Sequence, residues 1–233
     1  MNILITGATK GIGKAIALEM TKQNHALALC ARDQKDLDAL KKEIITINPK
    51  SQIYLSKTDC SNKEQLLSFI SNVINQIGII DVLINNVGVF SPSNILDEDD
   101  DQLDFHFKTN VFASYILYKK LAPLMIKQQK GHIFNICSVA SLQTIVNAGS
   151  YCVTKAAMLS LNNIMREETK PFKVKVTAIL PGSTLTSSWD GTTISPDQFI
   201  QAEDVAKSIH HIMQLSDGAN VDQLLITPQS GQI

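Results

Sequence analysis

Three side chains in the second half of the chain have types and a spacing suited to acid–base chemistry. Ser138 ends an apolar run, Tyr151 follows thirteen residues later, and Lys155 lies four residues beyond the tyrosine. Residues four apart share one face of a helix, so the phenol and the ammonium can lie close together. A nearby ammonium stabilises a phenolate, and a neighbouring serine hydroxyl can hold a substrate oxygen during proton transfer. These residues are therefore predicted to form a general acid–base site.

A glycine-rich turn near the start of the chain predicts a phosphate-binding site. It follows an apolar run, precedes an expected helix, and contains Gly7, Thr9, Lys10, Gly11, Ile12 and Gly13. Glycines let the backbone approach a pyrophosphate, and the helix that follows supplies free N–H groups. A P-loop is excluded because Ala8 and Ala15 occupy positions that require glycine and serine or threonine. The turn predicts a dinucleotide site, although its Gly-x3-Gly-x-Gly spacing differs from the common Gly-x-Gly-x2-Gly fingerprint.

The end of the second predicted strand indicates which dinucleotide binds. Enzymes that use NAD usually carry an acidic residue there, whereas this chain has Ala31 followed by Arg32. A guanidinium pairs with a 2′-phosphate in bidentate fashion, and Lys10 can reach the same phosphate. Asp33 is a competing candidate for an NAD ribose, but we interpret it as the cap of the next helix. NADPH is therefore predicted, with NAD as the less favoured cofactor.

The elements that must position these residues alternate between strands and helices. Short, near-continuous apolar runs predict buried strands at Asn2–Thr6, Ala26–Ala31, Gln52–Lys57, Asp81–Asn85, His132–Cys137, Val174–Leu180 and Gln223–Thr227. Helical periodicity separates them, for example over residues 37–47, 62–77, 105–118 and 205–213. This alternation predicts an α/β fold: a single-domain, Rossmann-type doubly wound sheet of about seven parallel strands with helices on both faces. The domain is expected to extend over residues 1–233.

Two local signals concern the starts of helices. Ser61 and Glu64 predict a capping box at the start of the helix over residues 62–77. Five acidic residues form the run Asp97–Asp101, and Asp104 follows. A metal site is one interpretation, but acids in a first helical turn complement the positive end of that helix. We favour the helical interpretation and predict no metal.

Composition excludes several classes of protein. The chain has 233 residues, 44% of them hydrophobic, and a formal net charge of −1, so no nucleic-acid or membrane-surface partner is expected. No apolar run is long enough to span a bilayer. A core strand is expected from Asn2 onward, so no secretory signal is expected. The cysteines, Cys30, Cys60, Cys137 and Cys152, form no CxxC pair and predict buried thiols in a reducing, cytoplasmic compartment.

Taken in their order along the chain, these motifs resemble those of the classical short-chain dehydrogenase/reductase family, and the resemblance covers essentially the whole chain. Asn85-Asn86-Val87-Gly88 is similar to the family's Asn-Asn-Ala-Gly, and Asp59 matches its adenine-contacting acid, with Cys60 beside it. Pro181-Gly182, with Thr184 and Thr186, resembles the segment that clamps the nicotinamide. Val87 replaces the usual alanine, and Thr184 replaces a branched apolar residue.

The resemblance implies a catalytic tetrad of Asn110, Ser138, Tyr151 and Lys155. Tyr151 is expected to act as general acid/base, and Lys155 to stabilise its phenolate and hold the nicotinamide ribose. Ser138 is expected to orient the carbonyl, and Asn110 to anchor the proton relay. Tyr151 and Lys155 thus contact the cofactor as well, which supplies the hydride.

The resemblance also suggests a substrate class and an assembly. The tail Leu225–Ile233 lacks the Asp-Gly-Gly ending of acyl-carrier ketoreductases and resembles the Pro-x-Ser-Gly-x-Ile ending of the bacterial sepiapterin-reductase-like branch. The expected function is NADPH-dependent reduction of a small-molecule carbonyl to an alcohol, with a pteridine such as sepiapterin as substrate. The alternatives are a 3-oxoacyl-carrier-protein or CoA-type ketoreductase and, more remotely, a non-catalytic nucleotide-sensing regulator.

Residues 185–201, including Trp189, are expected to form a lid. Apolar residues over 112–117 and 156–161 predict a homodimer or homotetramer.

Overall fold

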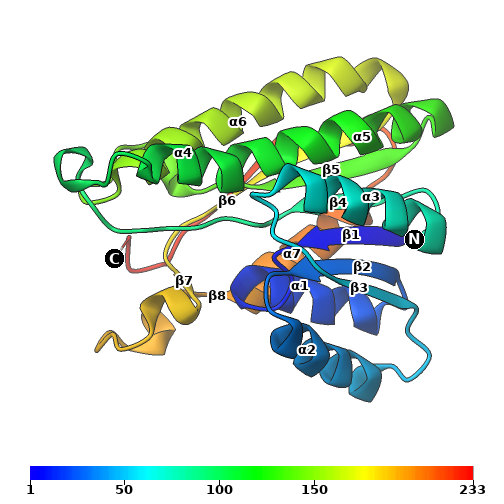
Figure 1. Ribbon diagram of the computed structural model, residues 1–233, viewed down its shortest axis with the longest axis horizontal. Coiled ribbons are helices and arrows are strands. Elements are labelled where there is room, and N and C mark those ends of the chain that lie inside the picture. Colours follow the sequence, from blue (N-terminus) through cyan, green and yellow to red (C-terminus); the bar gives the residue numbers. More distant parts are fainter. Residues whose placement is uncertain (233) are drawn as a thin grey trace.

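The computed structural model describes residues 1–232, and a parallel sheet of seven strands runs through its centre (Figure 1). The strands are β1 (Asn2–Thr6), β2 (Ala26–Ala31), β3 (Ile53–Lys57), β4 (Val82–Asn85), β5 (Gly131–Ile136), β6 (Val174–Pro181) and β9 (Gln223–Ile226). Their order across the sheet is β3-β2-β1-β4-β5-β6-β9. The seven predicted strands are confirmed, each boundary lying within one residue of the expected one.

Helices cover both faces of the sheet (Figure 1). One face carries α1 (Gly11–Lys22), α2 (Gln34–Ile47) and α7 (Ala202–Met213). The other carries α3 (Lys63–Ile77), α5 (Ala113–Gln128) and α6 (Gly149–Thr169), and the short helix α4 (Gln102–Phe107) precedes α5. The predicted single-domain Rossmann-type fold is therefore confirmed. Within residues 1–232, no helix has the length and apolar character needed to cross a membrane.

The apolar character of β1 shows why the strands are visible in the sequence. Ile3 and Ile5 pack into the cluster beneath α1 and α7, whereas Leu4 packs into the cluster beneath α3 and α5. All three side chains are fully buried. Successive residues of a strand point to opposite faces, so a strand covered on both sides is a continuous apolar run.

Two helix starts differ from the expected ones. Helix α3 begins at Lys63, and the cap is Asn62, whose side chain accepts a hydrogen bond from the Gln65 N–H at 2.9 Å. The Ser61 hydroxyl instead donates to Asp59 Oδ1 at 2.7 Å, so the Ser61–Glu64 capping box was wrong. The second difference concerns the acidic run, which was expected to lie in a first helical turn. Helix α4 begins only at Gln102, after the run, and of the predicted acids only Asp104 lies in its first turn.

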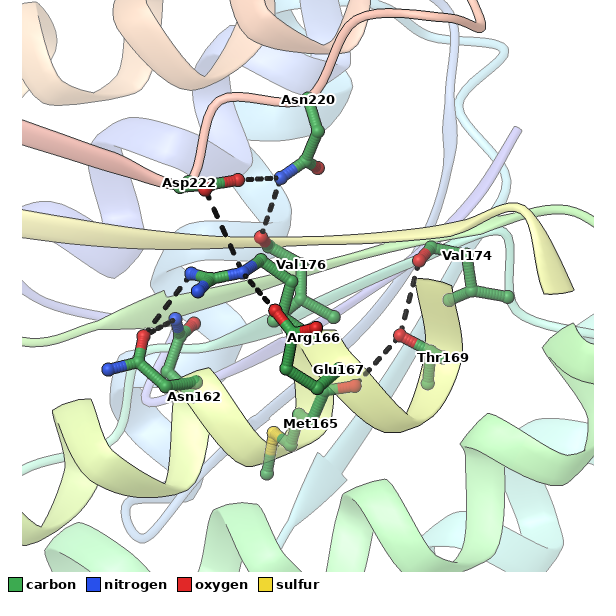
Figure 2. Close-up of polar contacts among 10 residues, drawn as sticks. Asn162, Met165, Arg166, Glu167, Thr169, Val174, Val176, Asn220 and Asp222 are labelled. Carbon is green, nitrogen blue, oxygen red and sulfur yellow. Dashed lines mark hydrogen bonds and ion pairs between the residues drawn. The ribbon is translucent and has the colours of Figure 1, made fainter. Parts of the chain in front are cut away.

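Helix α6 is tied to the far edge of the sheet by polar contacts, drawn in Figure 2. Arg166 Nε lies 3.8 Å from Asp222 Oδ2, in the loop before β9. The Asn220 side chain donates to the Val176 carbonyl of β6 at 3.3 Å and to Asp222 Oδ1 at 2.6 Å. These contacts fix the connection between α7 and β9 against the helix that carries Tyr151.

Buried His132 should make the stability of the fold depend on pH. Burial lowers the pKa of His132 to about 3, so the unfolded chain binds the extra proton below about pH 6.5 while the folded protein does not. This contribution to stability is present above pH 6.5 and is lost as the pH falls. We expect the free energy of unfolding to fall by about 2 kcal/mol more in the wild type than in His132→Leu between pH 7 and pH 5. Urea unfolding at both pH values tests this, and parallel changes in the two proteins would contradict it.

Candidate functional site

The predicted site residues gather at the carboxyl edge of the sheet. The strand order reverses between β1 and β4, because β2 and β3 lie to one side and β5 and β6 to the other. Ligands of open α/β sheets bind at such a switch point, beyond the carboxyl ends of the strands. The glycine turn follows β1, Asn86–Gly88 follow β4, Ser138 follows β5, and Gly182 follows β6.

The glycine turn has a shape that only glycine permits. Gly7 and Gly11 have positive φ values of +63° and +49°, a region that favours glycine. A Cβ atom on Gly13 would lie 2.3 Å from the Gly7 carbonyl oxygen and 2.4 Å from Asn86 Nδ2. Lys10 is the N-cap of α1, and its side chain makes no capping hydrogen bond. The first N–H groups of α1 thus lack a side-chain cap, as a phosphate-binding helix start requires.

Asn86 connects the glycine turn to the end of β4. Its Nδ2 donates to the carbonyls of Thr6 and Gly7 at 2.9 and 3.0 Å. The Thr6 hydroxyl accepts from the backbone N–H groups of Asn86 and Val87 at 3.1 and 3.0 Å. A Cβ on Gly88 would lie 3.5 Å from Asn110 Oδ1 and 3.6 Å from Lys155 Nζ. Gly88 therefore lies where the predicted cofactor site meets the predicted tetrad.

The two residues that follow β2 differ in whether their side chains are engaged: Asp33 caps α2, whereas Arg32 has no partner in the described part of the chain. Asp33 Oδ1 accepts from the N–H groups of Lys35 and Asp36 at 2.7 and 3.2 Å, which confirms Asp33 as the cap of α2 and lowers the pKa of its carboxyl. Lys10 Nζ lies 3.0 Å from Asp36 Oδ2. Arg32 is exposed, and no hydrogen bond or ion pair within residues 1–232 engages its side chain. Arg32 is thus a cation at this edge that is available to a ligand.

Asp59 and Cys60 lie beyond the end of β3. Asp59 Oδ1 accepts from the Ser61 N–H at 2.9 Å as well as from the Ser61 hydroxyl. Cys60 is buried, and its Sγ lies 3.7 Å from the Sγ of Cys30 on β2. The Asp59 turn is therefore packed against the strand that ends at Arg32.

Lys155 is the buried centre of the predicted tetrad. It is 5% exposed, and its Nζ donates to the Ile136 carbonyl at 2.8 Å. The same atom lies 5.6 Å from the centroid of the Tyr151 ring. Within residues 1–232, no hydrogen bond joins the Tyr151 hydroxyl to Lys155 or to Ser138. The ammonium and the phenol are therefore neighbours that share no direct hydrogen bond.

Cys137 and Ser138 follow the end of β5, near Lys155. Ser138 Oγ accepts from the Ala140 N–H at 3.1 Å, which holds the hydroxyl at the strand end. Burial raises the pKa of the Cys137 thiol to about 11, although Lys155 acts in the opposite direction. At neutral pH the thiol is protonated, so Cys137 is not available as a base.

Asn110 lies in a π-helical turn, Lys108–Phe112, between α4 and α5. Its Oδ1 accepts from the Val89 N–H at 2.8 Å, and its Nδ2 donates to the Val89 carbonyl and to Thr154 Oγ1 at 3.0 and 3.1 Å. Single π-turns occur frequently at functional sites, where they redirect a side chain or a carbonyl. Because the amide is fully engaged with the protein, Asn110 joins the segment after β4 to α6.

The segment after β6 reaches back to the glycine turn. The Thr184 hydroxyl donates to the Gly182 carbonyl at 2.9 Å, and a Cβ on Gly11 would lie 2.9 Å from Thr186 Cγ2. Pro181 ends β6 and is buried. The two ends of the predicted cofactor site are therefore in contact, although 175 residues separate Gly11 from Thr186.

Three further residues of the site carry no sequence signal. Phe90 packs edge-on against Tyr151, with ring centroids 4.9 Å apart. Thr154 accepts from Asn110 and donates to the Tyr151 carbonyl at 2.9 Å. Gln232 Oε1 accepts from the Ser183 N–H at 2.9 Å. All three act through neighbours that lie far away in the sequence or through the backbone, so neither residue type nor spacing identifies them.

The segment over residues 185–201 carries two short helical turns. It begins within β7 (Thr184–Leu185) and ends with β8 (Ile200–Gln201), and these two short strands pair with each other. Trp189 packs edge-on against Phe199, with centroids 4.9 Å apart. Phe199 is 5% exposed. Trp189 therefore has a packing role within this segment.

Comparison with known proteins gives matches over nearly the whole chain. Residues 1–195 match the family model described as short chain dehydrogenase. The chain is 30% identical to the sepiapterin reductase of Chlorobaculum tepidum, covering 99% of this chain and 97% of that protein. It is 28% identical to an uncharacterized oxidoreductase of Staphylococcus epidermidis, covering 97% and 96%.

Solved structures agree in fold. A metagenomic short-chain oxidoreductase in complex with NADP is similar with a TM-score of 0.85 and 26% identity, covering 98% of this chain and 97% of that chain. An alcohol dehydrogenase from Thermococcus sibiricus, complexed with 5-hydroxy-NADP, has a TM-score of 0.91 at 22% identity, covering 100% and 98%. The second similarity bears on the fold alone.

Proposed function

Because this chain belongs to the short-chain dehydrogenase family and is an oxidoreductase, we propose that it reduces a carbonyl group of a small molecule to an alcohol with NADPH. The observation that carries the proposal is the buried Lys155 ammonium, 5.6 Å from the Tyr151 ring and 2.8 Å from the end of β5, where Ser138 follows. A regulator that only senses a nucleotide needs no proton donor, whereas the phenol beside this cation can serve as one. The complete tetrad therefore favours an enzyme.

The residues present fit a dinucleotide. Gly13 has no room for a Cβ, and α1 begins without a side-chain cap, as close approach of a pyrophosphate requires. Exposed Arg32 suits the 2′-phosphate of NADPH. We propose that the cofactor is held by Gly7, Thr9, Lys10, Gly11, Ile12, Gly13, Arg32, Asp59, Cys60, Asn86, Val87, Gly88, Tyr151, Lys155, Pro181, Gly182, Thr184 and Thr186. NADPH supplies the hydride when bound.

The tetrad residues then divide the remaining work. The Ser138 hydroxyl donates to the carbonyl oxygen of the substrate and orients it. The Tyr151 hydroxyl transfers its proton to that oxygen as it becomes an alcohol. The Lys155 ammonium stabilises the phenolate left behind. Asn110 holds the turn after β4 against α6 through Val89 and Thr154, and in this proposal its backbone anchors the relay that returns a proton to Tyr151.

We propose a pteridine such as sepiapterin as the substrate. The whole-length similarity to a sepiapterin reductase and the Pro-x-Ser-Gly-x-Ile tail support this choice over an acyl-carrier-protein or CoA thioester. The decrease of NADPH absorbance with a panel of sepiapterin, diacetyl, acetoacetyl-CoA and simple aldehydes tests both the reductase activity and the choice of substrate. A higher rate with acetoacetyl-CoA than with sepiapterin would favour a CoA thioester as the substrate. Absence of turnover with every carbonyl compound would contradict the reductase assignment.

We also propose that residues 1–233 form one domain and that the protein acts in the cytoplasm. The common sheet, which extends from Asn2 to Ile226, supports one domain. The four cysteines are all thiols, although the Sγ atoms of Cys30 and Cys60 lie 3.7 Å apart. Thiols at that distance suit a reducing compartment.

A homodimer or homotetramer is expected from the apolar surface of α4–α6. Leu103, Phe105, Phe112 and Tyr115 are each 42–48% exposed, and Ile164 of α6 is 53% exposed. Leu117 and Met158, also expected at the interface, are buried in the monomer and contribute to its core. Exposed aromatic and aliphatic side chains on these helices favour an interaction surface. Light scattering at micromolar concentration should give at least twice the chain mass of 25.6 kDa, and a mass near 25.6 kDa would refute an oligomer.

A further inference from the structure

Two side chains from distant parts of the chain hold Ser150, the residue directly before Tyr151. His106 Nδ1 lies 2.6 Å from the Ser150 hydroxyl oxygen, and Glu98 Oε1 accepts from the Ser150 N–H at 2.8 Å. His106 is fully buried and Ser150 is 1% exposed. His106 lies in α4 and Glu98 in the acidic run before it, so both precede Asn110.

These contacts replace a missing helix cap. The N-cap of α6 is Ala148, which has no side-chain acceptor, although the first N–H groups of a helix have no partner within it. Glu98 supplies the acceptor for Ser150, and its negative charge suits this end of the helix. The Ser93 carbonyl accepts from the Gly149 N–H at 3.0 Å. A Cβ on Gly149 would lie 2.6 Å from Ile95 Cγ1, so this residue is packed tightly.

The second nitrogen of His106 indicates a role beyond stability. His106 Nε2 is buried, and within residues 1–232 it has no hydrogen-bond partner. An unsatisfied buried polar atom costs free energy, so an apolar side chain would suit the core better at this position. Burial lowers the pKa of His106 against the opposing effect of Glu98, which favours the neutral form of the ring. The one hydrogen bond of this imidazole instead holds Ser150, the residue next to Tyr151.

We propose that His106 and Glu98 are positioning residues that fix the first turn of α6 through Ser150 and thereby set the place of the Tyr151 hydroxyl. This inference rests on the proposed role of Tyr151 as proton donor. Proton transfer depends steeply on geometry: a displacement of about 1 Å costs up to about 100-fold in rate. Loss of either contact frees the turn that carries Tyr151, while the glycine turn after β1 is unaffected.

The test uses His106→Leu and Ser150→Ala in the full-length protein, with His106→Asn as the conservative variant, because its amide can occupy the Nδ1 position. His132→Leu is the matched control. His132 is also a buried histidine bonded to a hydroxyl, with Nε2 2.8 Å from Thr177 Oγ1. His132 lies near the amino end of β5, whereas the predicted site with Tyr151 lies beyond the carboxyl ends of the strands. Thermal unfolding of each variant identifies a temperature at which all are folded.

With diacetyl and NADPH, we expect His106→Leu and Ser150→Ala to lower kcat at least about 10-fold, with the KM for NADPH changed less than about 2-fold. His106→Asn should keep most of the activity, and His132→Leu should lose stability without losing kcat. In the Tyr151→Phe background, His106→Leu should change the residual rate less than about 2-fold, because the group that it positions is absent. Equal losses of kcat in His106→Leu and His132→Leu, or an undiminished effect in the Tyr151→Phe background, would overturn the proposal.

Amide hydrogen exchange provides a readout that needs no turnover. Exchange in the peptide over residues 149–155 should accelerate at least about 10-fold in His106→Leu and Glu98→Ala, and should be unchanged in His132→Leu. Unchanged exchange in the first two variants would overturn the positioning role. Absence of carbonyl reduction in the wild type, with this exchange pattern present, would contradict the proposed function alone.

Discussion

Tyr151→Phe should lower kcat for carbonyl reduction at least 100-fold, the lower end of what general acid catalysis contributes (about 100- to 10,000-fold). The substitution removes one oxygen atom and keeps the ring. Its edge-on contact with Phe90 is therefore retained, as is the position of Lys155, which is fixed by the Ile136 carbonyl. The proton that the alcohol product requires then has no donor at the reacting oxygen.

The measurement compares single-turnover and steady-state rates with NADPH for the wild type and the variant. Affinity for NADPH, measured by fluorescence titration, should change less than about 3-fold, because the phenol hydroxyl is not the main anchor of the cofactor. Tyr118→Phe is the matched control: this tyrosine donates to Glu168 at 2.6 Å on the outer side of α5 and α6. Its kcat should equal that of the wild type. A Tyr151→Phe enzyme that keeps more than a tenth of the wild-type kcat would exclude Tyr151 as the general acid.

The second large effect concerns the choice of cofactor. The wild type should use NADPH with a kcat/KM at least about 10-fold above that for NADH, because charge-assisted hydrogen bonds to the 2′-phosphate contribute about 1.5–3 kcal/mol. Arg32 should carry most of the preference. Lys10 is already paired with Asp36, and the carboxylate of Asp33 is committed to the cap of α2.

Arg32→Asp should therefore reverse or abolish the preference, since an acid accepts from a ribose hydroxyl and repels a phosphate. Lys10→Ala should reduce the preference by a smaller factor. Lys14→Ala serves as the control, because Lys14 lies one turn along α1 and is paired with Glu43 at 2.8 Å. Steady-state kinetics with both cofactors give the four ratios. Equal kcat/KM values for NADPH and NADH in the wild type would mean that Arg32 makes no contact with the cofactor.

Strands and motifs could be predicted because their causes are local. Leu27, Ala28 and Leu29 of β2 are all fully buried, as in β1, so composition alone marks the strand. Tyr151 and Lys155 lie on one face of one helix, so their spacing already implies their proximity. The fold class and the group of Ser138, Tyr151 and Lys155 follow from such short-range patterns, whereas the parts of the site played by Phe90, Thr154 and Gln232 do not.

Helix starts were less certain because several residues can cap the same helix. Ser61 and Asn62 are both good caps, and the hydrogen bond from Ser61 to Asp59 leaves Asn62 as the cap of α3. Glu98 was expected to act on α4, but the structure directs it to α6. An acidic residue favours any helix start within reach, and only the folded chain determines which one is near.

Contacts between distant segments depend on the order of strands across the sheet, which no local pattern encodes. Thr186 meets Gly11 because β6 and β1 end at the same edge. His106 meets Ser150 because α4 packs against the start of α6, 44 residues later in the chain. Periodicity showed that Leu117 and Phe112 belong to apolar faces, yet Leu117 is buried in the core and Phe112 is 48% exposed. Periodicity indicates that a face is apolar, whereas the neighbour that covers it is set by the packing of the whole chain.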